Sequence, residues 1–217
     1  MKKIINYGRQ QILKKDILSA VETLKSNFLT TGPKTVLFEK KFQEKFKVKY
    51  SLSCSSGTAA IHLALLSMNI KRGDIVILPV INFIASANIS ETLNAKLYFA
   101  DVDRYTGQMT PETLLACIKK NRLNKIKAVI TMYNAGDPLH AEEFYKIKKK
   151  YKFYLMEDAC HALGGKYHSS IKNYVGSCKF SDISIFSFHP VKTITTCEGG
   201  MITTNNKSLY NKIKIIR

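Results

Sequence analysis

Acidic side chains are scarce in this sequence: 16 aspartates and glutamates stand against 34 lysines and arginines, and tryptophan is absent. No stretch approaches the roughly 20 uninterrupted apolar residues of a membrane span. The two lysines at the start have no apolar run behind them, so they do not form a secretory signal. The sequence therefore predicts a cytoplasmic protein without a membrane partner.

Cysteine is also too sparse to build a disulfide framework. The five cysteines are an odd number and none forms a CxxC pair. This pattern argues against both a disulfide scaffold and a zinc site. We expect reduced, mostly buried thiols and no metal centre.

The net charge of +18 allows nucleic acid, a membrane surface or an acidic substrate as a partner. The lysines are spread through helical stretches such as 38–50 and 142–151, which is typical of solvated helix faces. No motif that reads nucleic acid is present. The charge is better explained by an anionic small-molecule substrate, and we expect no nucleic-acid partner.

Apolar residues make up 45% of the chain and charged residues 23%, the balance of a globular protein with a sizeable core. Helical patterns alternate with extended apolar runs, which predicts a mostly parallel sheet covered by helices on both faces. The last two strands are too close for a helix between them, so one is expected to run antiparallel or to be reached by a loop. The seven expected strands are 50–54, 74–79, 96–102, 127–132, 153–158, 183–188 and 201–204.

In such sheets ligands bind beyond the carboxyl ends of the strands. After the first strand, the small residues 55–58 lead into a helix of residues 58–68. Backbone N–H groups and the helix dipole make such a turn an anion site, and Ser56 and Thr58 add hydroxyl donors. Simple N-capping by serine is the alternative explanation.

Two further strand ends carry charged side chains. Glu157 and Asp158 end a buried strand, where an acid is costly unless a cofactor's ring nitrogen, a salt bridge or a metal compensates it. Lys192 follows another strand, in a segment short of other charges. A partly apolar pocket favours its neutral amine, a nucleophile toward carbonyls, although a surface lysine is the simpler reading.

Taken together, these signals describe one chemistry. An anion site, a carboxylate for a pyridinium nitrogen and a lysine amine are the protein groups that pyridoxal 5′-phosphate requires. Phe83, which follows the strand 74–79, is placed to stack on the ring.

The sequence resembles the DegT/DnrJ/EryC1/StrS sugar aminotransferases, which have the type I fold of pyridoxal-phosphate enzymes. The resemblance covers nearly the whole chain from about residue 28 onward. It implies a three-layer α/β/α sandwich around a mostly parallel seven-stranded sheet. The matching stretches include FLTTGPKTVLFEKKF, SSGTAAIHLAL, NFIASAN, ADVDRYTGQMTPETL, EDACHALGG, SDISIFSFHPVKTITTCEGG and MITTNN.

Residue by residue, the resemblance implies that Lys192 forms the Schiff base with the cofactor and that Asp158 partners its ring nitrogen. His161 falls where the family places a side chain near the ring hydroxyl. The other cofactor-binding residues implied are the phosphate ligands Gly57, Thr58, Ala59 and Ser187 and the stacking aromatic Phe83. Cys160 would pack against the opposite ring face.

The implied reaction takes an amino group from L-glutamate and places it on the keto carbon of a nucleotide-linked 4-keto-6-deoxy sugar. The stretches around Asp158 and Lys192 are most like the UDP-4-amino-4,6-dideoxy-N-acetyl-altrosamine transaminase subgroup. Related dehydratases carry histidine in place of the lysine, which Lys192 argues against. The family's active site is shared between two subunits, so a homodimer is expected.

The sequence departs from the family pattern in three ways. Cys197 replaces a common glycine, and Tyr133 replaces a histidine, which bears on substrate choice. The third is length: we expect an N-terminal helical segment, 1–27, and a cofactor-binding large domain, 28–217, without the family's small C-terminal domain. The alternative function is therefore a truncated, inactive fragment with a binding or regulatory role or none.

Overall fold

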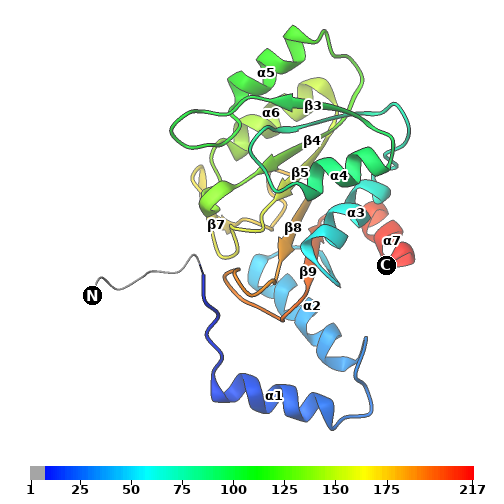
Figure 1. The fold of residues 1–217 in the computed structure, drawn as a ribbon, viewed down its shortest axis with the longest axis vertical. Coiled ribbons are helices and arrows are strands. Elements are labelled where there is room, and N and C mark those ends of the chain that lie inside the picture. The colour runs from blue at the N-terminus through cyan, green and yellow to red at the C-terminus, as the bar shows by residue number, and fades with distance from the viewer. Residues whose placement is uncertain (1–7) are drawn as a thin grey trace.

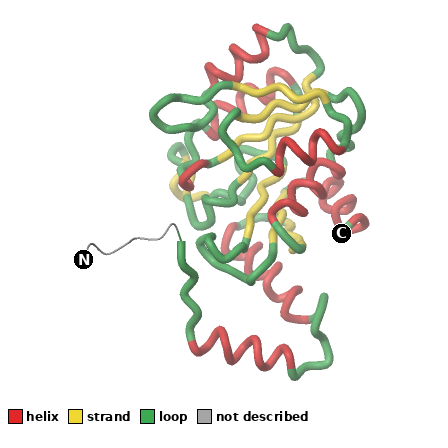
Figure 2. The backbone as a smooth tube through the Cα atoms, in the orientation of Figure 1, coloured by secondary structure: helices red, strands yellow, loops and turns green. Residues whose placement is uncertain are grey.

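The computed structural model describes residues 8–217 (Figure 1). Residues 1–7 of the expected N-terminal segment lie outside the described residues. The main body is a seven-stranded sheet with helices on both faces (Figure 2). The expected three-layer α/β/α architecture is therefore confirmed.

The seven strands are β1 (Tyr50–Cys54), β2 (Ile75–Pro79), β3 (Lys96–Ala100), β4 (Ile126–Met132), β5 (Tyr154–Asp158), β8 (Ile183–Ser187) and β9 (Gly200–Thr204). Their order across the sheet is β1-β9-β8-β5-β4-β2-β3. β9 runs antiparallel to both of its neighbours, and the other neighbouring pairs are parallel. The antiparallel strand expected from the short 188–199 connection is confirmed, because a parallel return needs a longer crossover.

Six helices cover the sheet: α2 (Pro33–Phe46), α3 (Gly57–Ser67), α4 (Ala85–Thr92), α5 (Pro111–Lys120), α6 (Ala141–Tyr151) and α7 (Lys207–Ile216). Successive side chains of β2 pack on opposite faces of the sheet. Val76 and Leu78 pack in the cluster with α3, α4 and α7, whereas Ile77 packs with α5 and α6. A third cluster joins α2 to the second face around Phe42 and Phe186. Because both faces are covered, the strands are nearly continuous apolar runs.

Local sequence explains where the helices begin. Thr110 caps α5, since its hydroxyl accepts the Thr113 N–H at 3.3 Å and Pro111 occupies the first helical position. α3 is apolar on most sides because it lies between the sheet, α4 and α7. The observed strand ends agree with the expected ones to within two residues, the usual uncertainty of such boundaries.

The sequence did not reveal a small hairpin formed by β6 (Lys166–Tyr167) and β7 (Ser170–Tyr174). Its strands are short and largely polar, so they show no alternation. The hairpin nevertheless buries Tyr167 completely, in the same cluster as Phe180 and Phe186.

The helix α1 (Lys14–Leu24) lies apart from the sheet (Figure 1). None of its residues is buried. It connects to the main body through residues 25–32, and Lys34 pairs with its Glu22 at 3.6 Å. α1 therefore presents apolar side chains that nothing in the described chain covers.

Glu157, in strand β5, is a buried carboxylate with only 1% of its surface exposed. The hydroxyls of Tyr133 and Tyr167 donate to it at 2.7 Å and 3.0 Å, and those of Ser181 and Ser184 also donate. Burial raises the pKa of Glu157, and the four hydroxyls oppose that shift. This carboxylate ties β4, β5, β6 and β8 together.

We predict that Glu157→Ala lowers the free energy of unfolding by about 3 kcal/mol, because buried hydroxyls lose their acceptor and a cavity is left. Urea denaturation monitored by circular dichroism measures the change. As a control, Glu143→Ala on the exposed face of α6 changes stability by less than about 0.5 kcal/mol. Equal effects of the two substitutions would contradict the stabilising role of the buried network.

Candidate active site

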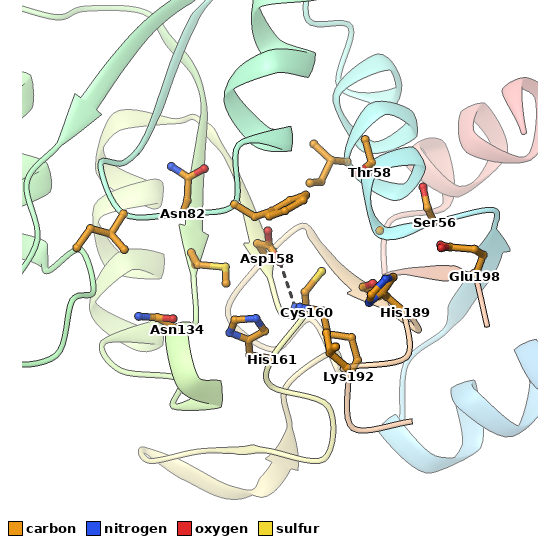
Figure 3. A pocket seen from close by; sticks show the side chains of 17 residues that line it. Ser56, Thr58, Asn82, Asn134, Asp158, Cys160, His161, His189, Lys192 and Glu198 are labelled. Atoms are coloured by element: carbon orange, nitrogen blue, oxygen red, sulfur yellow. Dashed lines mark hydrogen bonds between the residues drawn. The ribbon is translucent and has the colours of Figure 1, made fainter. Parts of the chain in front are cut away.

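A cavity of about 560 Å³ opens at the carboxyl ends of β2, β4, β5 and β8, beside the N-terminus of α3 (Figure 3). The structure brings together seven of the eight residues expected to bind the cofactor: Gly57, Thr58, Phe83, Asp158, His161, Ser187 and Lys192. The eighth, Ala59, is not among the lining residues. The carboxyl-end rule therefore located the cavity from sequence alone.

The turn before α3 both caps the helix and forms one wall of the cavity. The Ser56 hydroxyl accepts the Ala59 N–H at 3.0 Å, so the N–H of Ala59 already has a partner. A Cβ placed on Gly57 would lie 2.9 Å from the Cβ of Ser187, which only glycine avoids. The close approach places the Ser187 hydroxyl beside a helix N-terminus, a geometry suited to a phosphate group. Capping and anion binding are thus compatible here.

Asp158 ends β5 with its side chain toward the cavity and 1% of its surface exposed. The N–H of Cys160 donates to its carboxylate at 3.1 Å. Burial raises the pKa of Asp158, and the nearby His161 and Lys192 offset part of that rise. Among residues 8–217, no basic side chain lies within ion-pair distance of it. A cationic ring nitrogen bound beside this carboxylate would compensate its burial.

Lys192 reaches the cavity from the loop that follows β8, and its side chain is half-buried. The backbone N–H of Lys192 donates to the carbonyl of His189 at 2.9 Å. The loop is held closed because the Phe188 carbonyl accepts both the Thr196 N–H at 3.0 Å and the Thr195 hydroxyl at 2.9 Å. The lysine is thereby fixed on the same side of the cavity as Asp158 and His161 (Figure 3).

His161 and Cys160 follow Asp158 and line the same wall. Burial, and then the charge of Lys192, lower the pKa of His161, whereas the neighbouring Asp158 opposes that shift. Burial and the neighbouring Asp158 raise the pKa of the Cys160 thiol well above its usual value. The raised pKa favours the neutral thiol, and its packing against a cofactor ring stays a prediction. Phe83 stands at the mouth, 62% exposed, with an open ring face available for stacking.

Sequence reasoning missed the cavity residues Asn82, Asn134, His189 and Glu198. The side-chain oxygen of Asn82 is buried and has no hydrogen-bond partner within residues 8–217. It is therefore available to accept a hydrogen bond from a ligand. The sequence did contain a signal for these residues, because Asn82 lies three residues after the end of β2 and Asn134 lies two residues after the end of β4.

Tyr133, which replaces the family's histidine, does not face the cavity. Its side chain is 1% exposed and its hydroxyl donates to Glu157 on the other face of the sheet. The substitution therefore acts on the buried network, and Asn134 supplies the polar group at this position of the cavity wall.

Cys197 has a backbone φ of +64°, which explains why glycine is common at this position. The residue is exposed, and its N–H donates to the Thr195 hydroxyl at 3.0 Å. Three residues later the chain packs tightly, because a Cβ on Gly200 would lie 2.3 Å from the Ser56 carbonyl oxygen. The Lys192 loop thus carries local strain at Cys197.

We predict that Cys197→Gly raises the free energy of unfolding by about 1 kcal/mol, because glycine adopts positive φ without a steric penalty. Chemical denaturation measures the gain. The matched variant Cys197→Ala removes the thiol but keeps the Cβ, and should leave stability within about 0.5 kcal/mol of the parent. An equal gain in both variants would assign the effect to the thiol instead.

The residues present fit pyridoxal 5′-phosphate. The helix N-terminus and Ser187 suit its phosphate, the uncompensated Asp158 suits its ring nitrogen, and Lys192 suits its aldehyde. The absence of a Cβ at Gly57 lets the Ser187 side chain approach the first turn of α3. Within residues 8–217, no three metal-ligating side chains come together.

Comparison with known proteins agrees with this site. The family model for the DegT/DnrJ/EryC1/StrS aminotransferase family matches residues 10–217. The chain is 41% identical over 175 residues to GDP-perosamine synthase of Escherichia coli O157:H7, covering 81% of this chain and 46% of that protein. It is 38% identical over 214 residues to UDP-4-amino-4,6-dideoxy-N-acetyl-beta-L-altrosamine transaminase of Campylobacter jejuni, covering 99% and 55%.

Among solved structures, the Helicobacter pylori PseC aminotransferase, involved in pseudoaminic acid biosynthesis, superposes with a TM-score of 0.87 at 31% identity. That match covers 99% of this chain and 56% of PseC. The PLP-form of the putative sugar aminotransferase Spr1654 from Streptococcus pneumoniae gives a TM-score of 0.86 at 27% identity, covering 97% and 57%. The chain spans about half the length of the curated relatives it matches.

A sheet of this order, a cavity beyond its carboxyl ends, and a family match over nearly all described residues converge on one assignment. The chain belongs to the DegT/DnrJ/EryC1/StrS aminotransferase family.

Proposed function

We propose that this chain is the cofactor-binding part of a pyridoxal-phosphate-dependent nucleotide-sugar aminotransferase. The observation that carries the proposal is the convergence of Lys192, Asp158 and the α3 N-terminus on one cavity. These groups come from strands far apart in the sequence. Their meeting at one sheet edge satisfies three separate requirements of the same cofactor.

When bound, pyridoxal phosphate would supply an electron sink for the reacting carbon. Asp158 holds a proton at the ring nitrogen, which its burial and position beside the cavity favour. The Lys192 amine holds the cofactor between turnovers and moves protons at the reacting carbon atoms. The α3 N-terminus and Ser187 anchor the phosphate, and Phe83 covers a ring face and excludes water.

The acceptor we propose is a nucleotide-linked 4-keto-6-deoxy sugar. The names of both curated relatives describe sugars that carry a nucleotide, and the Campylobacter jejuni name places the amino group at C4. The basic net charge suits a diphosphate, and Asn82 and Asn134 supply amides for sugar hydroxyls or an N-acetyl group. L-Glutamate is the proposed amino donor, as the family resemblance implies, and the five free thiols suit the reducing cytoplasm.

The exposed apolar surface supports a homodimer. Along α1, Ile17, Val21 and Leu24 form a stripe at helical spacing and are 56%, 39% and 71% exposed. Phe83 and Ile84 at the cavity mouth are also exposed. Contiguous apolar surface of this kind marks interaction sites. A second copy of the chain is the proposed occupant of the α1 stripe, and the region 28–217 is the proposed large domain.

We predict that the purified protein mixed with pyridoxal phosphate gains a visible absorbance band that Lys192→Ala abolishes. After borohydride reduction, peptide mapping should find the cofactor on Lys192. Lys172→Ala, a matched change at the exposed β7, should keep both the band and the label. A label on another lysine, or no band from well-folded protein, would favour the inactive-fragment alternative.

We predict further that Ile17→Glu with Val21→Glu converts a dimer into a monomer, measured by light scattering after gel filtration, because charges would enter an apolar contact. Ser19→Glu with Thr23→Glu adds the same charge to positions of α1 outside the apolar stripe and should leave the dimer intact. A monomeric parent protein would contradict the homodimer.

A further inference from the structure

Cations gather at the amino edge of the sheet, defined as the end where β2, β3, β4 and β5 begin. This end is opposite the cavity, and its loops lie on the right-hand side of Figure 1. The strand starts are nearly level, since Ile75 pairs with both Lys96 and Ile126, and Ala128 with Tyr154. The exposed basic residues at or just before these starts are Lys71, Arg72, Lys96, Arg122, Lys125 and Lys152.

Two helices deliver more lysines to the same edge. α5 ends with Lys119 and Lys120, and α6 carries Lys148, Lys149 and Lys150 in its last turn. Cations stabilise helix C-termini by interacting with the helix dipole, which accounts for some of these side chains. The dipole does not account for the basic residues in the loops before β2 and β4, which are outside any helix.

Carboxylates are few at the amino edge, and two of them, Asp182 and Asp74, are already engaged. Asp182 pairs with Lys148 at 3.2 Å and accepts the Leu155 N–H at 2.8 Å. Asp74 accepts the Lys71 N–H at 3.1 Å, and Glu91 is the remaining acid nearby. Apart from Lys148, no basic side chain of this edge lies within ion-pair distance of a carboxylate in residues 8–217. The acids of α5 and α6 lie in their first turns, at the cavity end.

A recess of about 340 Å³ is present within this edge, lined by Lys148, Lys149, Lys152, Phe153, Tyr154 and Asp182. Because Asp182 is neutralised by Lys148, the recess keeps uncompensated positive charge from Lys149 and Lys152. The recess therefore adds to the positive charge of the amino edge.

The chemistry favours a flat, diffuse anionic surface over a nucleic acid. The basic side chains are mostly lysines, which act as mobile point charges, whereas arginine supplies the fixed forks that grip individual phosphates and bases. Level strand starts distribute the charge over a plane rather than along a groove. We propose that the amino edge binds the surface of an anionic lipid bilayer.

Such binding needs no spanning segment, and within residues 8–217 no helix is long and apolar enough to cross a bilayer. Polybasic surfaces are attracted to anionic lipids without insertion. With the amino edge on the lipid, the cavity at the opposite edge faces the solution and stays open to dissolved substrates. This proposal departs from the expectation of no membrane partner, because the lysines of the amino edge belong to separate segments between residues 71 and 152 and form no single run in the sequence.

Co-sedimentation with vesicles tests the proposal. The protein should bind phosphatidylcholine vesicles containing about 30% phosphatidylglycerol at about 50 mM salt, and pure phosphatidylcholine at least about ten-fold more weakly. Binding should fall at least about ten-fold at about 300 mM salt, because exposed charges are screened. Equal binding to both vesicle types, or no binding to either, would overturn the proposal.

Matched variants locate the binding surface. Replacing Lys119, Lys120, Lys149 and Lys150 by glutamine should weaken vesicle binding at least about ten-fold. The control replaces four exposed lysines in or near α2, at the opposite margin of the sheet: Lys40, Lys41, Lys45 and Lys49. It removes the same charge and should change binding less than about three-fold. Equal losses in both variants would show attraction by net charge alone and would overturn the proposal.

Two further arms separate the lipid surface from other anions. Inorganic phosphate should release the protein no better than chloride at equal ionic strength, and a stronger effect of phosphate would assign the edge to a discrete phosphate ligand. Binding to random duplex DNA without binding to vesicles would assign it to nucleic acid. Both variants should keep the parent's circular dichroism and its cofactor absorbance, so a failure of the proposed catalytic function remains distinguishable.

Discussion

Two adjacent carboxylates on the buried strand β5 need partners that compensate their charge, and the rest of the structure depends on how each is compensated. Alternation along β5 sends Glu157 and Asp158 to opposite faces of the sheet. Four hydroxyls surround Glu157, whereas Asp158 accepts one backbone N–H from Cys160. A buried charge with so little compensation requires a cation nearby. The Asp158 carboxylate borders the cavity. A cationic group of a bound cofactor could therefore lie beside it and compensate its charge.

The sheet order determines which groups meet Asp158. β8 lies beside β5, so the loop after β8 carries Lys192 to the same wall as His161. β9 returns antiparallel from that loop and pairs with β1, which delivers the turn before α3 to the other side of the cavity. The contact between Gly57 and Ser187 closes this arrangement. One short antiparallel return thus joins the lysine loop and the anion site.

The two ends of the sheet differ in charge. The acids of α5 and α6 lie in their first turns, near the cavity edge, and their lysines lie in the last turns, as helix dipoles favour. Basic loops before β2 and β4 add to the second group. The molecule therefore has a cavity end and a strongly basic opposite end. Apolar side chains are left exposed on α1 and at the cavity mouth, where a second copy is proposed to bind.

The sequence by itself determined the seven-stranded sheet, the layers, and the cavity residues from Gly57 to Lys192, because periodicity, capping residues and strand-end chemistry are local signals. Other features became visible only in the folded chain: the direction of the Tyr133 side chain, the use of Ala59 in a cap, the β6–β7 hairpin and the positive φ of Cys197. The tertiary structure also decided that scattered lysines form one basic edge. These features depend on contacts between residues far apart in the chain, and no local pattern encodes such contacts.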